Sequence, residues 1–313
     1  MNIGLVFPGQ GAQYVGMGKT LLDQYATARD TFAEADERLG FQLTKLCLEG
    51  PEAELRLTYY TQPALLTASI AFYRVLAERV DVQAMVAAGH SLGEYSALVA
   101  ADALSFSDAV HLVYQRGRLM DAAVPAGQGT MAAVLGMEED ALAEICAQVT
   151  REVGEVVEIA NLNCPGQIVI SGTVAAVAKA GEAAKATGAR RAIPLTVSGP
   201  FHCSLMEPAA SEFGKLLDAT NIADAGIPVV ANVDAAPHQK AAEIRDVLKR
   251  QLYCPVRFTD DVLAMRAMGA DMLLELGPGA VLSGLIRKID KGILTANVED
   301  DATLEQAIQR LTN

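Results

Sequence analysis

The stretch "AAGHSLGEYSALVAA" (87–101) joins a run of small and apolar residues to a segment of helical character. Its centre, "GHSLG" (89–93), satisfies the pattern G-x-S-x-G. In that pattern the glycines permit a sharp turn from a strand into a helix, and the serine oxygen projects above the sheet. The stretch therefore predicts an α/β fold and a candidate nucleophile at Ser91. A tight structural connection without catalytic function would produce the same five residues.

The rest of the chain shows the same alternation of strands and helices. Short apolar runs predict buried strands at 2–7, 84–90, 227–233 and 271–277. Helical spacing predicts helices after Pro63 and over 94–101 and 107–123. This order is typical of an α/β domain with a mostly parallel sheet.

Between residues 130 and 195 the predicted order changes to βαββαβ, which is that of a ferredoxin-like α+β unit. We therefore expect a hydrolase-like α/β core with this smaller subdomain inserted in it. The expected boundaries are 1–126 and 198–313 for the discontinuous catalytic core, and 127–197 for the ferredoxin-like subdomain.

Composition excludes several classes of protein. The chain has 313 residues, of which 51% are hydrophobic, enough for a sizeable core. Its net charge of −13 argues against a general nucleic-acid binder. The five cysteines are widely spaced without a CxxC pair, so neither a zinc site nor a disulfide framework is expected. No signal peptide or membrane span is evident, and we expect a soluble cytoplasmic protein.

A serine nucleophile needs a base, and the chain offers only four histidines. His90 adjoins Ser91 on the turn, His111 lies inside a predicted helix, and His238 follows a loop. His202, in the loop "VSGPFH" (197–202), lies at the junction of the two predicted units, where sites are common. His202 is therefore the predicted base. Its orienting partner stays open between Glu275, an amide and a main-chain carbonyl.

Two further groups are candidates for an acyl-transfer site. The N–H of Leu92, after the nucleophile, is one expected oxyanion donor, and the glycine-rich loop 7–13 is a candidate source of the second. That loop lacks the phosphate-binding patterns of nucleotide sites. Arg116 lies in an otherwise apolar helix, where a cation needs a partner. A substrate carboxylate is one possible partner. The alternative is that Arg116 lies on the surface of the helix, where water solvates it.

Taken together, the sequence resembles the malonyl-CoA:acyl-carrier-protein transacylase family of fatty-acid synthesis. The resemblance covers essentially the whole chain, in family order. It is carried by "LVFPGQGAQYVGMG", "TQPALLTASIA", "GHSLGEYSALVAA", "RGRLM", "GTMAAVLG", "ANLNCPGQIVISG", "VSGPFHCSLMEPA", "QLYCPVRF" and "LELGPGAVLSGL".

The resemblance implies a role for each site residue. Ser91 would carry the malonyl group and His202 would be its base, with Gln251 as the residue that orients the histidine. The N–H groups of Gln10 and Leu92 would form the oxyanion hole. The implied substrate-binding residues are Arg116 for the malonyl carboxylate, and Phe201 and Met120 for the pocket. Glu275 then has a structural role, and neither a metal nor a cofactor is required beyond malonyl-CoA and the holo-carrier protein.

The resemblance also implies an acidic partner, acyl carrier protein, although this chain is itself acidic. Docking would then need a local basic patch, and the candidates are Arg190, Arg191, Arg287, Lys288 and Lys291; a solvated charged face is the alternative. A monomer is expected. Three other functions are weighed: a trans-acting acyltransferase for a polyketide synthase or malonate-decarboxylase carrier, a serine esterase, and a non-catalytic binding module. The esterase predicts a late histidine, and none follows His238.

Overall fold

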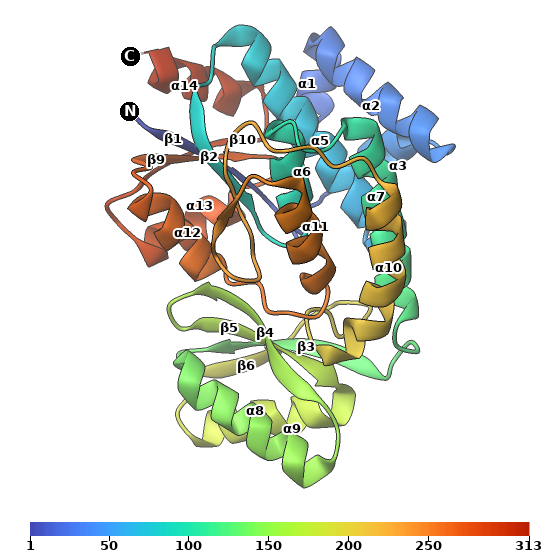
Figure 1. The fold of residues 1–313 in the computed structure, drawn as a ribbon, viewed down its shortest axis with the longest axis vertical. Coiled ribbons are helices and arrows are strands. Elements are labelled where there is room, and N and C mark those ends of the chain that lie inside the picture. Colours follow the sequence, from blue (N-terminus) through green and yellow to red (C-terminus); the bar gives the residue numbers. More distant parts are fainter. Residues whose placement is uncertain (313) are drawn as a thin grey trace.

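The computed structural model describes residues 1–312, which form two sheets with their own helices (Figure 1). The main sheet has the strand order β10-β9-β1-β2-β7-β8 within these residues. Its strands are β1 (Ile3–Phe7), β2 (Ala84–Gly89), β7 (Val229–Val230), β8 (Pro237–His238), β9 (Met272–Leu276) and β10 (Leu294–Val298). All of its pairs are parallel except β7 with β8, so the prediction of a mostly parallel sheet is confirmed.

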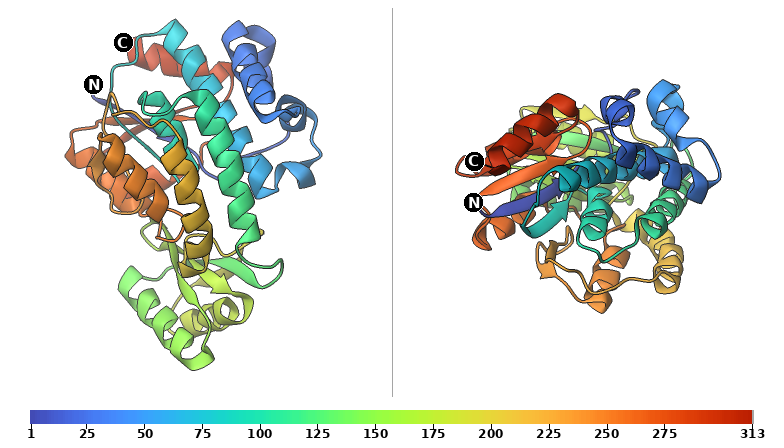
Figure 2. Two further views of the ribbon diagram at one scale, coloured as in Figure 1. Left: turned by 45° about the vertical axis from the view of Figure 1, so that its right-hand side comes forward. Right: turned by 90° about the horizontal axis from the view of Figure 1, so that it is seen from above.

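Helices cover both faces of the main sheet (Figures 1 and 2). They are α1 (Lys19–Gln24), α2 (Ala26–Leu39), α3 (Leu43–Glu49), α4 (Glu52–Leu55), α5 (Thr58–Arg79), α6 (Gly93–Ala100), α7 (Phe106–Ala122), α10 (Glu207–Ala219), α11 (Ala241–Arg250), α12 (Phe258–Ala267), α13 (Val281–Ile289) and α14 (Asp301–Thr312). Alternate residues of β1 enter different cores: Leu5 and Phe7 pack with α5 and α6, and Val6 packs with α12 and α13. This two-sided burial explains why the strands read as continuous apolar runs.

The second sheet lies at one end of the molecule and is antiparallel, in the order β4-β5-β3-β6 (Figure 1). Its strands are β3 (Gly129–Leu135), β4 (Val157–Cys164), β5 (Gln167–Thr173) and β6 (Arg191–Pro194). The helices α8 (Glu139–Val153) and α9 (Val174–Ala186) cover one face and share a separate core with it. The predicted βαββαβ order is confirmed.

Three details differ from the sequence-based expectations. The helix α5 begins at Thr58 and contains Pro63, whereas helical spacing was expected only after that proline. The predicted strand 227–233 shortens to β7, because the chain leaves the sheet before Asn232. The edge strands β8 and β10 were not predicted, since they are at most partly buried and lack continuous apolar runs. No helix within residues 1–312 combines the length and apolar character needed to cross a membrane.

Candidate active site

The turn at Ser91 connects β2 to α6, and its backbone requires the two glycines. Ser91 has a φ of +51°, in the left-handed region that a non-glycine residue rarely adopts. A Cβ on Gly89 would lie 1.9 Å from the carbonyl carbon of Gly93, and one on Gly93 would lie 2.0 Å from the oxygen of Phe7. Side chains at these positions are therefore excluded by the close packing of β1, β2 and α6.

Ser91 and His202 are hydrogen-bonded partners. The Oγ of Ser91 lies 2.8 Å from Nε2 of His202, and Nδ1 of the same ring lies 2.8 Å from the main-chain oxygen of Gln251. Because a carbonyl oxygen only accepts, Nδ1 carries the proton of the neutral ring. Nε2 is then free to accept the proton of the serine hydroxyl, which is the arrangement a general base needs.

Burial controls the protonation of His202. The ring is almost completely buried, and this burial, together with the adjacent Arg116 cation, lowers the pKa of His202 from 6.5 to about 3. The hydrogen bond to Gln251 acts in the opposite direction but is the weaker effect. The imidazole is therefore neutral at physiological pH.

Arg116 extends from α7 to the same serine. Its Nη2 donates to Ser91 Oγ at 3.1 Å and to Gln251 Oε1 at 3.0 Å, and its Nη1 donates to Gln62 Oε1 at 2.9 Å. Three of its five N–H groups thus have acceptors within residues 1–312, and the buried Nε has none. The residue is 1% exposed, so the surface interpretation of Arg116 is excluded.

The site residues surround a cavity of about 110 Å³ between the two sheets. Its polar lining comes from Gln10, His90, Ser91, Arg116, Asn161 and His202, and its apolar lining from Leu92, Met120, Met131, Leu195, Val197 and Phe201. Strand β4 of the small unit is tied to the segment after α11 by main-chain hydrogen bonds between Val256 and both Ala160 and Leu162. The small unit therefore supplies one wall of a cavity whose nucleophile belongs to the main sheet.

Gln10 and Leu92 line this cavity from two different loops, and each has a main-chain N–H. Neither N–H donates to an acceptor within residues 1–312. Gln10 follows β1, and its side chain reaches Thr58 Oγ1 at 3.5 Å. Leu92 is the N-cap of α6, where the helix dipole adds positive potential. An oxyanion hole requires two free donors beside the serine oxygen, so both N–H groups are candidates for it.

The chain is similar in sequence to known acyl transferases over almost its whole length. The acyl transferase domain family matches residues 5–308. A malonyl CoA-acyl carrier protein transacylase of Bacillus subtilis is 52% identical over 310 residues, covering 99% of this chain and 97% of the relative. A malonyl CoA-acyl carrier protein transacylase of Escherichia coli is 45% identical over 304 residues, covering 97% of this chain and 98% of the relative. The chain belongs to the malonyl-CoA:acyl-carrier-protein transacylase family.

Solved structures of the transacylase family share the fold. An acyl carrier protein S-malonyltransferase from Vibrio cholerae superposes with a TM-score of 0.95 at 48% identity, covering 98% of this chain and 100% of the other. A malonyl-transacylase in complex with its type II polyketide synthase acyl-carrier protein superposes with a TM-score of 0.97 at 45% identity, covering 99% and 100%. The hydrolase-like core with its inserted small sheet is thus the fold of this transacylase family.

The hydrogen bond that orients His202 is accepted by the main-chain oxygen of Gln251. Because every residue has a main-chain oxygen, no sequence pattern predicts this contact. The side chain of Gln251 has a different task. Its Nε2 donates to the main-chain oxygen of Ser91 at 3.0 Å and to Glu94 Oε2 at 2.8 Å. Glu275 lies apart from this cluster, because its carboxylate accepts the N–H groups of Leu282 and Ser283 at the start of α13.

Sequence reasoning missed three buried polar residues behind the turn: Glu94, Asn232 and Asp261. Burial raises the pKa of Glu94 to about 7 and that of Asp261 well above its usual value. A signal for one of them existed, since Asn232 interrupts the apolar run "IPVVANV". Residues 1–312 contain no group of three or more His, Cys, Asp or Glu side chains placed to hold a metal ion.

Three of the five basic candidates for docking line one cavity. Arg190, Arg191 and Lys288 line a shared cavity of about 400 Å³ at the edge of the small sheet. Arg287 instead donates to Thr295 Oγ1, and Lys291 is exposed beyond the end of α13.

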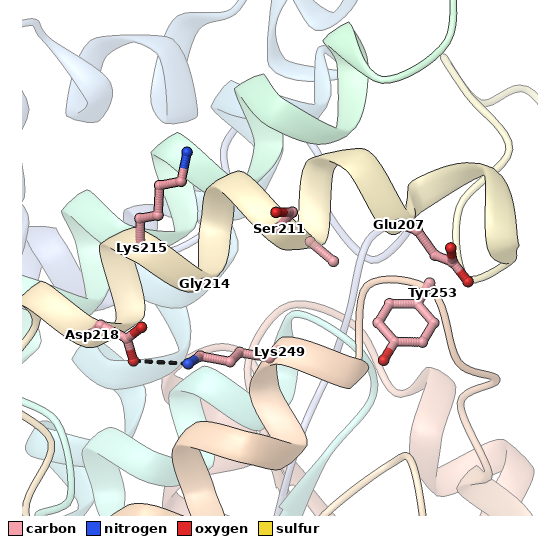
Figure 3. Close-up of a pocket in the computed structure, with 8 residues that line it drawn as sticks. Glu207, Ser211, Gly214, Lys215, Asp218, Lys249 and Tyr253 are labelled. Atoms are coloured by element: carbon pink, nitrogen blue, oxygen red, sulfur yellow. Dashed lines mark hydrogen bonds and ion pairs between the residues drawn. The ribbon is translucent and has the colours of Figure 1, made fainter.

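A separate groove of about 540 Å³ lies between α10 and α11 (Figure 3). Glu207, Ser211 and Tyr253 line it, together with the ion pair of Lys249 and Asp218, whose atoms lie 2.8 Å apart. None of the residues lining Ser91's cavity lines this groove. Although this groove is larger than the cavity at Ser91, its lining gives no reason to assign it a part in acyl transfer.

The lowered pKa of His202 predicts an unusual pH profile. Since the base must be neutral, the rate of serine acylation by malonyl-CoA should show no acid limb near pH 6.5 and stay within about twofold between about pH 5 and pH 8. Single-turnover acylation measured across this range tests the expectation. Glu94→Gln is the control, because Glu94 titrates near pH 7 beside the site. An acid limb near pH 6.5 that persists in Glu94→Gln contradicts the prediction.

Proposed function

We propose that this protein transfers the malonyl group from malonyl-CoA to the phosphopantetheine thiol of an acyl carrier protein. The observation that carries the proposal is a buried cation, Arg116, donating to the same serine oxygen that His202 accepts from, inside a small cavity. A site for hydrolysing neutral esters has no use for a buried guanidinium at its nucleophile. A free carboxylate on the acyl group accounts for it.

The first half-reaction forms a malonyl-serine. As Ser91 Oγ attacks the thioester carbon, His202 Nε2 takes the hydroxyl proton, and the N–H groups of Gln10 and Leu92 stabilise the oxyanion. The C–S bond then breaks, and the departing coenzyme A thiolate takes the proton from His202. Arg116 binds the malonyl carboxylate, and Phe201 and Met120 limit the size of the acyl group.

The second half-reaction reverses these steps with a different thiol. His202 takes the proton of the carrier's thiol, the sulfur attacks the malonyl ester, and the proton returns to Ser91 as the C–O bond breaks. Neither half-reaction requires a metal or an additional cofactor. The test is mass spectrometry of the protein after mixing with malonyl-CoA: a malonyl adduct on Ser91 that holo-carrier protein discharges supports the proposal, and its absence contradicts it.

The same chemistry serves carriers of different pathways. One structural neighbour is a malonyl-transacylase bound to a type II polyketide synthase carrier, so that second carrier class has a specific observation in its favour. Comparing discharge rates with the two classes of carrier decides between fatty-acid and polyketide supply. We further propose a cytoplasmic monomer, with a catalytic core of 1–126 and 198–313 and a ferredoxin-like subdomain of 127–197.

We propose that the carrier docks beside Arg190, Arg191 and Lys288. Adjoining cavities support a path from there to the serine. The cavity at these cations shares Gln167 with a second cavity of about 180 Å³, which in turn shares Gln10 and His90 with the cavity at Ser91. A pantetheine arm following this path would bring its thiol to the serine while the acidic carrier stays outside. Arg287 and Lys291 would contribute long-range attraction.

Charge reversal tests the docking site. Arg190→Glu combined with Arg191→Glu should raise the carrier-protein KM by about tenfold or more, because like charges then face the acidic carrier. The coenzyme A half-reaction should keep its rate. Lys185→Glu, at an exposed position on α9 of the same unit, is the control for reversing a cation outside the proposed docking site. An unchanged carrier KM in the double variant would retire this surface.

A further inference from the structure

Asn232 holds the turn that carries Ser91. The residue follows β7, is completely buried, and directs its side-chain amide at two main-chain groups of the turn. Its Oδ1 accepts the N–H of Ser91 at 2.8 Å, and its Nδ2 donates to the carbonyl oxygen of Gly89 at 2.7 Å. The amide therefore bridges the residues on both sides of His90.

The chemistry of these two contacts selects an amide. The N–H of Ser91 can only donate and the carbonyl of Gly89 can only accept, so the group between them must present one acceptor and one donor. A carboxylate has no donor for the Gly89 oxygen, and an apolar side chain leaves both buried groups unpaired. The same two partners also fix which end of the amide is nitrogen.

Neighbouring buried groups hold the amide in place. Asp261 Oδ2 accepts a second hydrogen bond from Nδ2 at 2.8 Å, and Glu94 Oε2 accepts the main-chain N–H of Asn232 at 2.9 Å. The Glu94 carboxyl also accepts from Gln251 Nε2, whose residue supplies the carbonyl that orients His202. The turn and the histidine are thus anchored to the same buried cluster.

We propose that Asn232 is a positioning residue for the nucleophile. The left-handed backbone of Ser91 is an unfavourable conformation that persists only where surrounding contacts impose it, and the Asn232 amide supplies two such contacts. Holding this conformation aims Oγ at His202 and keeps the N–H of Leu92 turned to the cavity. The inference rests on the proposed role of Ser91 as the acylated residue.

Asn232→Asp tests the proposal with an isosteric side chain. The single-turnover acylation rate at saturating malonyl-CoA should fall about 10- to 100-fold, because a slightly misplaced nucleophile loses rate steeply. The half-saturating malonyl-CoA concentration should stay within about threefold, since Arg116 and the pocket are unchanged. If Asn232 contributed only to stability, the folded variant would keep both its acylation rate at saturating malonyl-CoA and its half-saturating malonyl-CoA concentration.

Two companion measurements make the result specific. Leu142→Ala, in the separate core of the small unit, should lower the melting temperature but keep the acylation rate of the folded protein within about twofold. Labelling of Ser91 by a fluorophosphonate probe, which has no malonyl group, should slow in Asn232→Asp about as much as acylation does. If the wild type takes the probe but no malonyl group, the proposed function fails while the role of Asn232 remains measurable.

A folded Asn232→Asp protein with acylation and labelling within about threefold of wild type would overturn the inference. Should that variant not fold, the crystal structure of the wild-type malonyl-enzyme decides instead. Both contacts of the Asn232 amide, to Ser91 N and to Gly89 O, should then remain within hydrogen-bonding distance. A malonyl-enzyme that keeps the positive φ of Ser91 with either contact broken would refute the positioning role.

Discussion

Replacement of Ser91 by alanine is expected to reduce malonyl transfer by at least about 10³-fold, as loss of a covalent nucleophile does in other serine enzymes. The substitution removes the only atom that can form the ester while leaving His202, Arg116 and the cavity in place. Malonyl-CoA should therefore still bind, and no malonyl adduct should appear on the intact protein. Transfer to holo-carrier protein and intact mass, measured on the same samples, test both expectations.

Ser96→Ala is the matched control for this substitution. Ser96 lies on α6, one turn beyond Ser91, and its buried Oγ has no hydrogen-bond partner within residues 1–312. Its removal should leave transfer within about twofold of wild type. If Ser91→Ala retained full transfer, the proposed mechanism would be wrong, and the chain would be a binding module or would use another nucleophile.

Replacement of Arg116 by alanine should change substrate selectivity as well as rate. Removing one partner of a buried charge pair costs about 2–5 kcal/mol, which corresponds to a loss of malonyl transfer between roughly 30-fold and roughly 4,000-fold. Acetyl transfer, which involves no free carboxylate, should fall by about tenfold or less. That smaller loss reflects the hydrogen bonds from Arg116 to Ser91 and Gln251. Comparing kcat/KM for malonyl-CoA and acetyl-CoA measures the difference.

Arg118→Ala provides the control on the same helix. Arg118 is exposed and lies over the ring of Tyr114, so its removal should leave kcat/KM unchanged for both malonyl-CoA and acetyl-CoA. Arg116→Lys should fall between wild type and Arg116→Ala, because it keeps the charge but loses the two-pronged donor geometry. An equal loss of malonyl and acetyl transfer in Arg116→Ala would remove the carboxylate role and leave Arg116 as a structural partner of Gln251.

Much of the fold was predictable because its pattern is local. The buried strands β1, β2 and β9 are continuous apolar runs, and the βαββαβ unit alternates strand and helix periods over a short stretch. The failures are at the edges. Strands β8 and β10 lie at the two edges of the main sheet, and their extended conformation depends on pairing with a neighbouring strand. The start of α5 depends on packing against α7. There Gly117 lets α7 approach so closely that a Cβ would lie 2.5 Å from the Cα of Tyr59.

The site was predictable where residue identity carries the chemistry. A serine between two glycines and a scarce histidine in a junction loop were sufficient to nominate Ser91 and His202, which the structure places 2.8 Å apart. Arg116 was undecided from spacing alone, because a helix position does not reveal burial. Asn232, Glu94 and Asp261 come from three distant segments, and no pattern along the chain connects them.

The sequence by itself determined the strand-turn-helix that carries Ser91, the inserted βαββαβ unit and the family. These depend on local sterics, on hydrophobic period and on many motifs in order. Only the tertiary structure decided which atoms complete the site: the main-chain carbonyl of Gln251 behind His202, the buried guanidinium at Ser91 Oγ, and the Asn232 amide behind the turn. Such contacts join main-chain groups and side chains from distant segments, so they exist only once the two sheets and their helices have packed together.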